Sequence, residues 1–113
     1  ISDIFEQPLG ICTLPNGGFA IADSGTDQVV LLNQECEVQR RIGTTGMGMG
    51  EFWSPTDVAI DHKGRLIVLD HGNHRAQIFD LDGTWLVTFG KGRSYTRDRP
   101  RPPSRPVTTR ETR

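Results

Sequence analysis

Three histidines and two cysteines are the side chains of this chain best suited to binding a metal ion. His62, His71 and His74 lie close together in the sequence, and imidazole is a common zinc ligand. However, all three stand in or beside turn sequences, and none has a zinc-like spacing from Cys12 or Cys36. The pattern therefore favours turn packing over metal binding for these histidines.

Aspartates at the ends of two apolar runs form a second candidate set. Asp23 and Asp70 each precede an x-Gly turn, where a carboxylate usually accepts hydrogen bonds from backbone N–H groups. The segment 46–50 alternates Gly and Met, but it lacks the GxGxxG spacing and the Lys-Ser/Thr of a phosphate-binding loop. No nucleophile and base stand in a recognisable arrangement, so the sequence predicts no catalytic residue.

An internal repeat organises these residues. A shift of 47 positions aligns residues 8–43 with residues 55–90 without a gap. The shift keeps hydrophobic residues in register, and it also pairs Pro8 with Pro55, Gly17 with Gly64, Asp23 with Asp70, Gly25 with Gly72, and Gly43 with Gly90.

Each repeat has the pattern of four short strands. In the second repeat, residues 57–61, 65–70, 75–80 and 85–90 are rich in Val, Ile, Leu, Phe and Trp, and turns containing Asp and Gly separate them. The second run of each repeat is apolar at odd and even positions, which is typical of a strand buried on both faces. The sequence therefore predicts an all-β chain of antiparallel meanders.

The second repeat resembles an NHL repeat. Its motifs are Pro55-Thr-Asp-Val-Ala-Ile-Asp, Gly64-Arg-Leu-Ile-Val-Leu-Asp and Gly72-Asn-His-Arg-Ala-Gln-Ile-Phe-Asp, followed by Asp82-Gly and Phe89-Gly. The family is named after an Asn-His-Leu motif, and many members carry Asn-His-Arg, as this chain does at 73–75. The first repeat has Thr26-Asp27-Gln28 in that place. The resemblance implies a four-stranded β-propeller blade, in a family whose propellers usually close with six blades.

We therefore expect an all-β fold of two four-stranded antiparallel β-propeller blades, an incomplete propeller, followed by a disordered C-terminal tail. Residues 1–7 end a blade connector, 8–43 form blade 1, 44–54 are a Gly-rich connector, and 55–90 form blade 2. Residues 91–113 are basic and rich in Pro and Arg. They contain too few hydrophobic residues to offset the entropy cost of ordering, which predicts disorder.

Two blades do not close a ring, and each outer blade leaves an apolar face and an unpaired edge. Two interpretations follow. The favoured one is that the chain is a piece of a larger propeller. The other is self-association through the open faces, with three chains of two blades forming a six-bladed C3 ring.

Charge is divided between the two parts of the chain. Residues 1–90 carry five basic and twelve acidic side chains, a net charge of −7, whereas residues 91–113 carry a net charge of +6. The acidic body disfavours RNA, although some NHL proteins bind single-stranded RNA on a basic face.

No transmembrane segment or signal peptide is visible, which indicates a soluble protein of unassigned compartment. A Cys12–Cys36 disulfide is not expected, because the alignment places one residue on a strand and the other in a turn.

The resemblance directs attention to one residue of the innermost strands, which line the central channel of a propeller. Asp57 stands where the first repeat has Gly10. A channel-facing carboxylate would help to hold a divalent metal, as in propeller hydrolases and lyases, provided that other blades supply further ligands. This is the chain's candidate metal residue.

The turns provide the other candidate site, since propeller faces bind proteins through their loops. We expect a non-enzymatic interaction or scaffold module that binds a protein partner and needs no cofactor. The alternative is a fragment of a six-bladed hydrolase or lyase with a divalent metal in its channel, so enzymatic activity stays open. The candidate binding surface consists of Trp53, His71, Asn73, His74 and Arg75.

Overall fold

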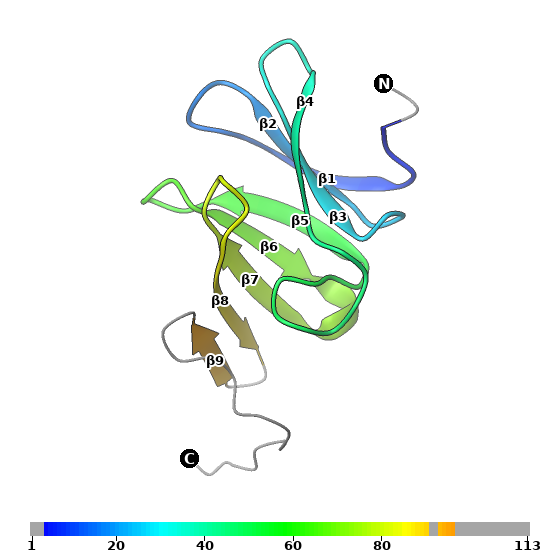
Figure 1. The fold of residues 1–113 in the computed structure, drawn as a ribbon, viewed down its shortest axis with the longest axis vertical. Helices are drawn as coiled ribbons and strands as arrows, with labels where there is room; N and C mark the ends of the chain where they lie inside the picture. Colours follow the sequence, from blue (N-terminus) through cyan, green and yellow to red (C-terminus); the bar gives the residue numbers. More distant parts are fainter. Residues whose placement is uncertain (1–3, 91–92, 97–113) are drawn as a thin grey trace.

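The computed structural model describes residues 4–90 and 93–96, which form two antiparallel sheets (Figure 1). The first sheet contains β1 (Pro8–Thr13), β2 (Phe19–Asp23), β3 (Gln28–Leu32) and β4 (Val38–Ile42), in that spatial order. The second contains β5 (Pro55–Ile60), β6 (Leu66–Asp70), β7 (Arg75–Phe79), β8 (Trp85–Gly90) and β9 (Arg93–Thr96), with the short 3-10 helix η1 (His71–Asn73) between β6 and β7. The predicted all-β fold of two antiparallel blades is confirmed.

The sequence repeat extends to the irregularities of the sheets. The β1–β2 ladder shifts register between Pro8 and Gly10, and the β5–β6 ladder shifts at the equivalent positions in blade 2. A second shift falls between Leu31 and Leu32 on β3, and again 47 residues later on β7. Because bulges re-aim side chains and increase local twist, the two blades share their local geometry as well as their strand order.

The second sheet differs from the expected four strands at its outer edge. Arg93–Thr96 form β9, which pairs antiparallel with β8, so the predicted disorder does not hold for these four residues. The pairing with β8 accounts for this strand: β8 offers a free edge for backbone hydrogen bonds, and Tyr95 and Thr96 are residue types that favour strands. The remainder of the predicted tail, residues 91–92 and 97–113, lies outside the described residues.

The hydrophobic core lies between the two blades. Ala20 and Ala22 of β2 are fully buried there, together with Leu66 and Val68 of β6. The Phe52 ring, at the end of the connector, packs on Phe79 with a centroid distance of 5.5 Å. Burying a side chain such as Leu, Val or Phe contributes about 1.5–3 kcal/mol, so stacking of the blades is the main source of stability.

The turns use the expected residue types, with one difference in conformation. Asp61 accepts hydrogen bonds from the backbone N–H groups of Lys63 and Arg65, and Gly64 has a φ of 78°. In the β6–β7 turn, however, the left-handed residue is His74, with a φ of 55°, rather than Gly72. Glycine is required at 72 for space, because a Cβ there would lie 2.3 Å from the Trp53 carbonyl oxygen.

Both cysteines are free thiols, as the repeat alignment indicated. Cys12 lies on β1 and Cys36 in the β3–β4 turn. Burial raises the pKa of the Cys12 thiol above its ordinary value. Over residues 4–90 and 93–96, no helix combines the length and the apolar character needed to cross a membrane.

Candidate functional site

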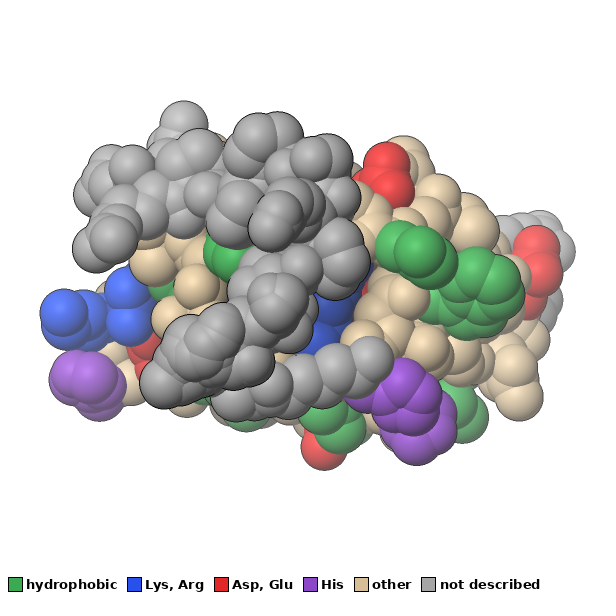
Figure 2. All heavy atoms as spheres, turned by 90° about the horizontal axis from the view of Figure 1, so that it is seen from below, with side chains coloured by type: hydrophobic (Ala, Val, Ile, Leu, Met, Phe, Trp, Pro, Cys, Tyr) green, Lys and Arg blue, Asp and Glu red, His purple; other side chains and the backbone are tan. Residues whose placement is uncertain are grey.

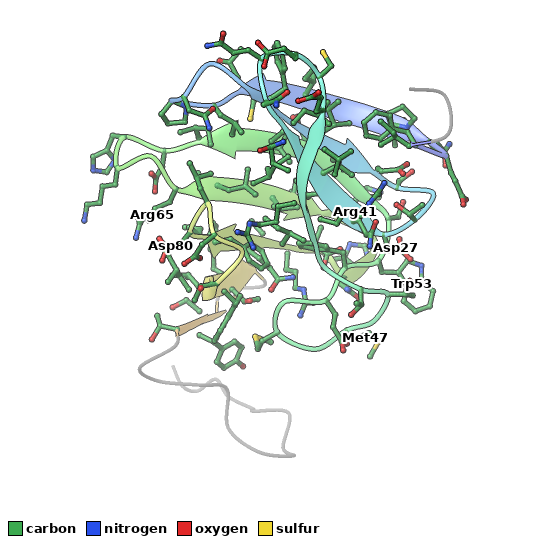
Figure 3. All side chains as sticks on the ribbon, turned by 45° about the horizontal axis from the view of Figure 1, so that its top comes forward. Asp27, Arg41, Met47, Trp53, Arg65 and Asp80 are labelled. Carbon is green, nitrogen blue, oxygen red and sulfur yellow. The ribbon has the colours of Figure 1, made fainter. Side chains whose placement is uncertain are left out.

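Three loops meet at one end of the blades and form a surface that we call the loop face. It comprises the β2–β3 turn (24–27), the connector (44–54) and the β6–β7 turn (71–74). Asp27 Oδ1 accepts a hydrogen bond of 2.7 Å from Ser54 N, and Asn73 Nδ2 donates one of 2.9 Å to the Gly46 carbonyl. Figure 3 shows Asp27, Met47 and Trp53 together at this end, whereas Arg65 and Asp80 lie at the other.

Buried aspartates anchor the loop face from below. Asp70 is fully buried and accepts hydrogen bonds from Trp53 N at 2.8 Å, Asn73 Nδ2 at 2.9 Å and Arg75 Nε at 2.9 Å. In blade 1, Asp23 accepts hydrogen bonds in the same way from the backbone N–H groups before β1 and from its own turn. The predicted capping of its own turn through a backbone N–H group is confirmed for Asp23. Asp70 accepts no backbone hydrogen bond from its own turn and is instead bound by the Asn73 and Arg75 side chains. Both carboxylates also bind the chain segment that enters their blade.

The surroundings of Asp23 favour its charged form. Burial opposes ionisation, but backbone N–H groups of Gln7 and Glu6 and the Thr26 hydroxyl donate hydrogen bonds to the carboxylate. These bonds outweigh burial, so the pKa of Asp23 lies below its ordinary value. A buried carboxylate with this many donors serves as a structural anchor.

Arg75 fixes the path of the connector. Its guanidinium pairs with Asp70 and donates hydrogen bonds to the carbonyls of Met47, Gly48 and Glu51 at 2.7–2.8 Å. Since five donors in a rigid fork suit several acceptors at once, arginine is well matched to this position. The connector is therefore held against blade 2 by the same residues, Asn73 and Arg75, that form part of the family's repeat motif.

A buried polar network completes the support of the connector. Gln77 is fully buried; its side chain accepts a hydrogen bond from Gly50 N and donates one to the Glu51 carbonyl. Thr88 joins Gln77 to the Trp85 indole N–H. Sequence analysis did not predict this network; the signal for it in the sequence is a glutamine that stands between the apolar residues Ala76 and Ile78.

Exposed aromatic, thioether and imidazole groups stand on this fixed scaffold. Met47 is 64% exposed and Trp53 is 54% exposed. His71 and His74 are also exposed, with ring centroids 6.3 Å apart. On the right of Figure 2, hydrophobic side chains lie beside a histidine group at the described surface. Trp and Met are enriched in protein interfaces, so this composition suits contact with a protein.

A hollow of about 140 Å³ adjoins the loop face at the β8–β9 edge. Sequence analysis did not predict it, because β9 supplies one of its walls. Its lining includes Met49, His74, Arg75, Phe89 and Tyr95.

Asp57 lies apart from the loop face, on β5. Its side chain is exposed, and Oδ1 accepts a hydrogen bond of 2.9 Å from Val58 N. A Cβ on Gly10 of the neighbouring β1 would lie 2.7 Å from the Asp57 Cα, so the glycine makes room for this approach. Within residues 4–90 and 93–96, no three His, Cys, Asp or Glu side chains are grouped closely enough to hold a metal ion.

Comparison with known proteins gives the following matches. A family model described as a 6-bladed β-propeller matches residues 8–89. The human NHL repeat-containing protein 3 is 33% identical over 86 residues, which is 73% of this chain and 25% of that protein. The Drosophila melanogaster protein brain tumor is 39% identical over 51 residues, which is 45% of this chain and 5% of that protein. The Caenorhabditis elegans protein lin-41 is 46% identical over 44 residues, covering 39% of this chain and 4% of that protein. The chain thus spans a quarter or less of the length of these relatives.

A solved structure supports the architecture. The fold is similar to that in a crystal structure of a protein of unknown function from Bacteroides caccae, with a TM-score of 0.60. The similarity covers 77% of this chain and 28% of that chain, at 15% sequence identity, so it concerns the fold alone.

Proposed function

The chain belongs to the six-bladed β-propeller family and is built from NHL-type repeats, and on this basis we propose that it is a non-enzymatic, protein-binding module that uses its loop face. The observation that carries the proposal is that an exposed side chain, Trp53, stands on a connector whose backbone is held by hydrogen bonds from blade 2. The connector backbone is fixed by Asp70, Asn73, Arg75 and Gln77, while Trp53 projects into solvent. Rigid aromatic anchors lose little entropy on binding, which favours affinity.

The charge of the body supports a protein partner over a nucleic acid. Residues 1–90 have a net charge of −7, which repels phosphate groups. Arg75, the basic residue beside the loop face at the start of β7, already donates to Asp70 and to three connector carbonyls. The surface offered to a partner therefore consists mainly of Met47, Trp53 and the two histidines.

Peptide selection on the immobilised chain tests this function. We expect a random peptide library to yield binders whose affinity falls at least tenfold with Trp53→Ala and with Met47→Ala, since hot-spot side chains contribute about 2 kcal/mol or more. Val38→Ala is the matched control, because Val38 is exposed on β4 rather than on the loop face. Binders that tolerate both loop-face changes, or tight binding of single-stranded RNA in their place, would contradict the proposal.

A further inference from the structure

The two blades present different side chains at equivalent positions of their loops. The shift of 47 residues pairs Glu6 with Trp53, and each stands two residues before the first strand of its blade. Each also packs on a glycine of a turn in its own blade. A Cβ on Gly25 would lie 2.5 Å from the Glu6 Cβ, and a Cβ on Gly72 would lie 2.7 Å from the Trp53 ring. Both side chains are exposed, so a carboxylate over blade 1 corresponds to an indole over blade 2.

A second carboxylate stands where the loops of the two blades meet. Asp27 Oδ1 accepts a hydrogen bond of 2.7 Å from Ser54 N, and Oδ2 accepts one of 2.9 Å from the Thr45 hydroxyl. These bonds hold the Asp27 carboxylate against the residue that follows Trp53, at the end of the molecule where Figure 3 shows both side chains. Among the described residues, neither Asp27 nor Glu6 has a Lys or Arg partner.

The buried aspartates add to the difference between the blades. In blade 2, Asp70 pairs with Arg75 at 2.9 Å, so the two charges cancel. In blade 1, Gln28 stands in the place of Arg75, and Asp23 is bound by backbone N–H groups and a hydroxyl instead of a cation. Asp23 therefore leaves a negative charge beneath the loops of blade 1.

These observations give the loop face two chemically different halves. Over blade 1, the three carboxylates of Glu6, Asp23 and Asp27 stand against one guanidinium at this end, that of Arg41, which donates to Gln28 at 3.2 Å (Figure 3). Over blade 2, the exposed groups are aromatic and imidazole rings. A negative potential attracts cations, and the face of an indole ring attracts a cation through its quadrupole. Both halves therefore suit a cationic side chain next to an apolar one.

We propose that the segment recognised by the loop face is basic, with Arg or Lys side chains that bind the Glu6 and Asp27 carboxylates, one of them beside the Trp53 ring. The inference rests on the proposed function, because it names the chemistry of the partner for the same surface. The net charge of −7 over residues 1–90 acts in the same direction, since it favours the approach of a basic segment and disfavours an acidic one.

The peptides selected on the immobilised chain test the inference. We expect Arg and Lys to be enriched in binders over their frequency in the library. The affinity of a selected peptide, measured by fluorescence anisotropy, should fall about twofold to fivefold with Glu6→Gln and by a similar factor with Asp27→Asn. It should also weaken as NaCl is raised from about 0.05 M to about 0.5 M, because salt screens exposed charges.

Glu35→Gln is the matched control, because it removes the same charge from an exposed residue in the β3–β4 turn, at the opposite end of blade 1. Glu6→Gln should leave the fold unchanged by circular dichroism, since the Glu6 carboxylate makes no hydrogen bond to the described residues. We expect the peptide affinity of the Glu35→Gln chain to equal that of the wild type.

The outcomes separate this inference from the proposed function. Binders that depend on Trp53 but are neutral or acidic, or that tolerate both Glu6→Gln and Asp27→Asn, would overturn the basic partner and leave the proposed function standing. An equal loss of affinity with Glu35→Gln would overturn it too, because the effect would then come from the overall charge. If binders tolerate loss of Trp53 and Met47, the proposed function fails and this inference fails with it.

Discussion

Arg75 and Asn73 connect the repeat motif to the geometry of the blade. Both side chains reach from the β6–β7 turn to the connector, and both also bind the buried Asp70. Their polar groups therefore act first on the chain itself, by fixing the segment that carries Trp53. His74, between them, adopts a left-handed conformation and keeps its ring exposed. Within the motif, Asn73 and Arg75 make the structural contacts, whereas His74 contributes exposed surface.

Replacing Arg75 tests this division. Arg75→Lys keeps the charge but loses the fork that reaches Asp70 and three carbonyls, so buried acceptors lose their donors. We expect the free energy of unfolding, measured by urea denaturation, to fall by about 2–3 kcal/mol. Arg65→Lys is the matched control, because the Arg65–Asp61 pair is more exposed and its loss should change the free energy of unfolding much less. Equal losses for the two variants would contradict this account.

Asp23 makes stability depend on acid pH. Its pKa in the folded chain lies below the ordinary value of about 3.9, so the unfolded chain takes up the proton first as the pH falls. The stabilisation is complete above pH 5 and is lost as the pH falls below about 4 toward the folded pKa. Asp23→Asn should lower the free energy of unfolding by about 1–3 kcal/mol at pH 7 and flatten this acid dependence. Parallel wild-type and variant curves in urea denaturation between pH 6 and pH 3 would contradict the assignment.

At the scale of elements, the join between β4 and the connector depends on Gly43. Its φ is 100°, and a Cβ there would lie 2.3 Å from the Phe52 ring. Gly43→Ala combines backbone strain with displacement of a core ring, so we expect a loss of about 3 kcal/mol or more. Gly50→Ala is the matched control: its φ is also positive, at 84°, but the nearest atom lies at 3.9 Å, and we expect about 1–2 kcal/mol. Urea denaturation of both variants measures the difference, and equal losses would show that the Phe52 contact is unimportant.

The strands of the repeat were predictable because periodicity, turn residues and the 47-residue shift agree. Blade 2 has strands within two residues of the expected bounds. β9 was not predictable, since its Ser-Tyr-Thr sequence is short and gains its hydrogen bonds only from the edge of β8. The hydrogen bonds from Asn73, Arg75 and Gln77 to the connector were also not predicted, because they join residues 24–28 positions apart that come together only in the folded chain. Sequence patterns report local preference, whereas these features arise from tertiary contacts.

At the scale of the whole molecule, the two blades bury one interface and leave both of its counterparts open. The inner interface contains the core, including the fully buried Phe52 and Phe79. The open face of blade 2 carries Ile67, Leu69 and Phe89 at the positions of Ala20, Ala22 and Ile42, so it has the register of a face that packs against another blade of the six-bladed family.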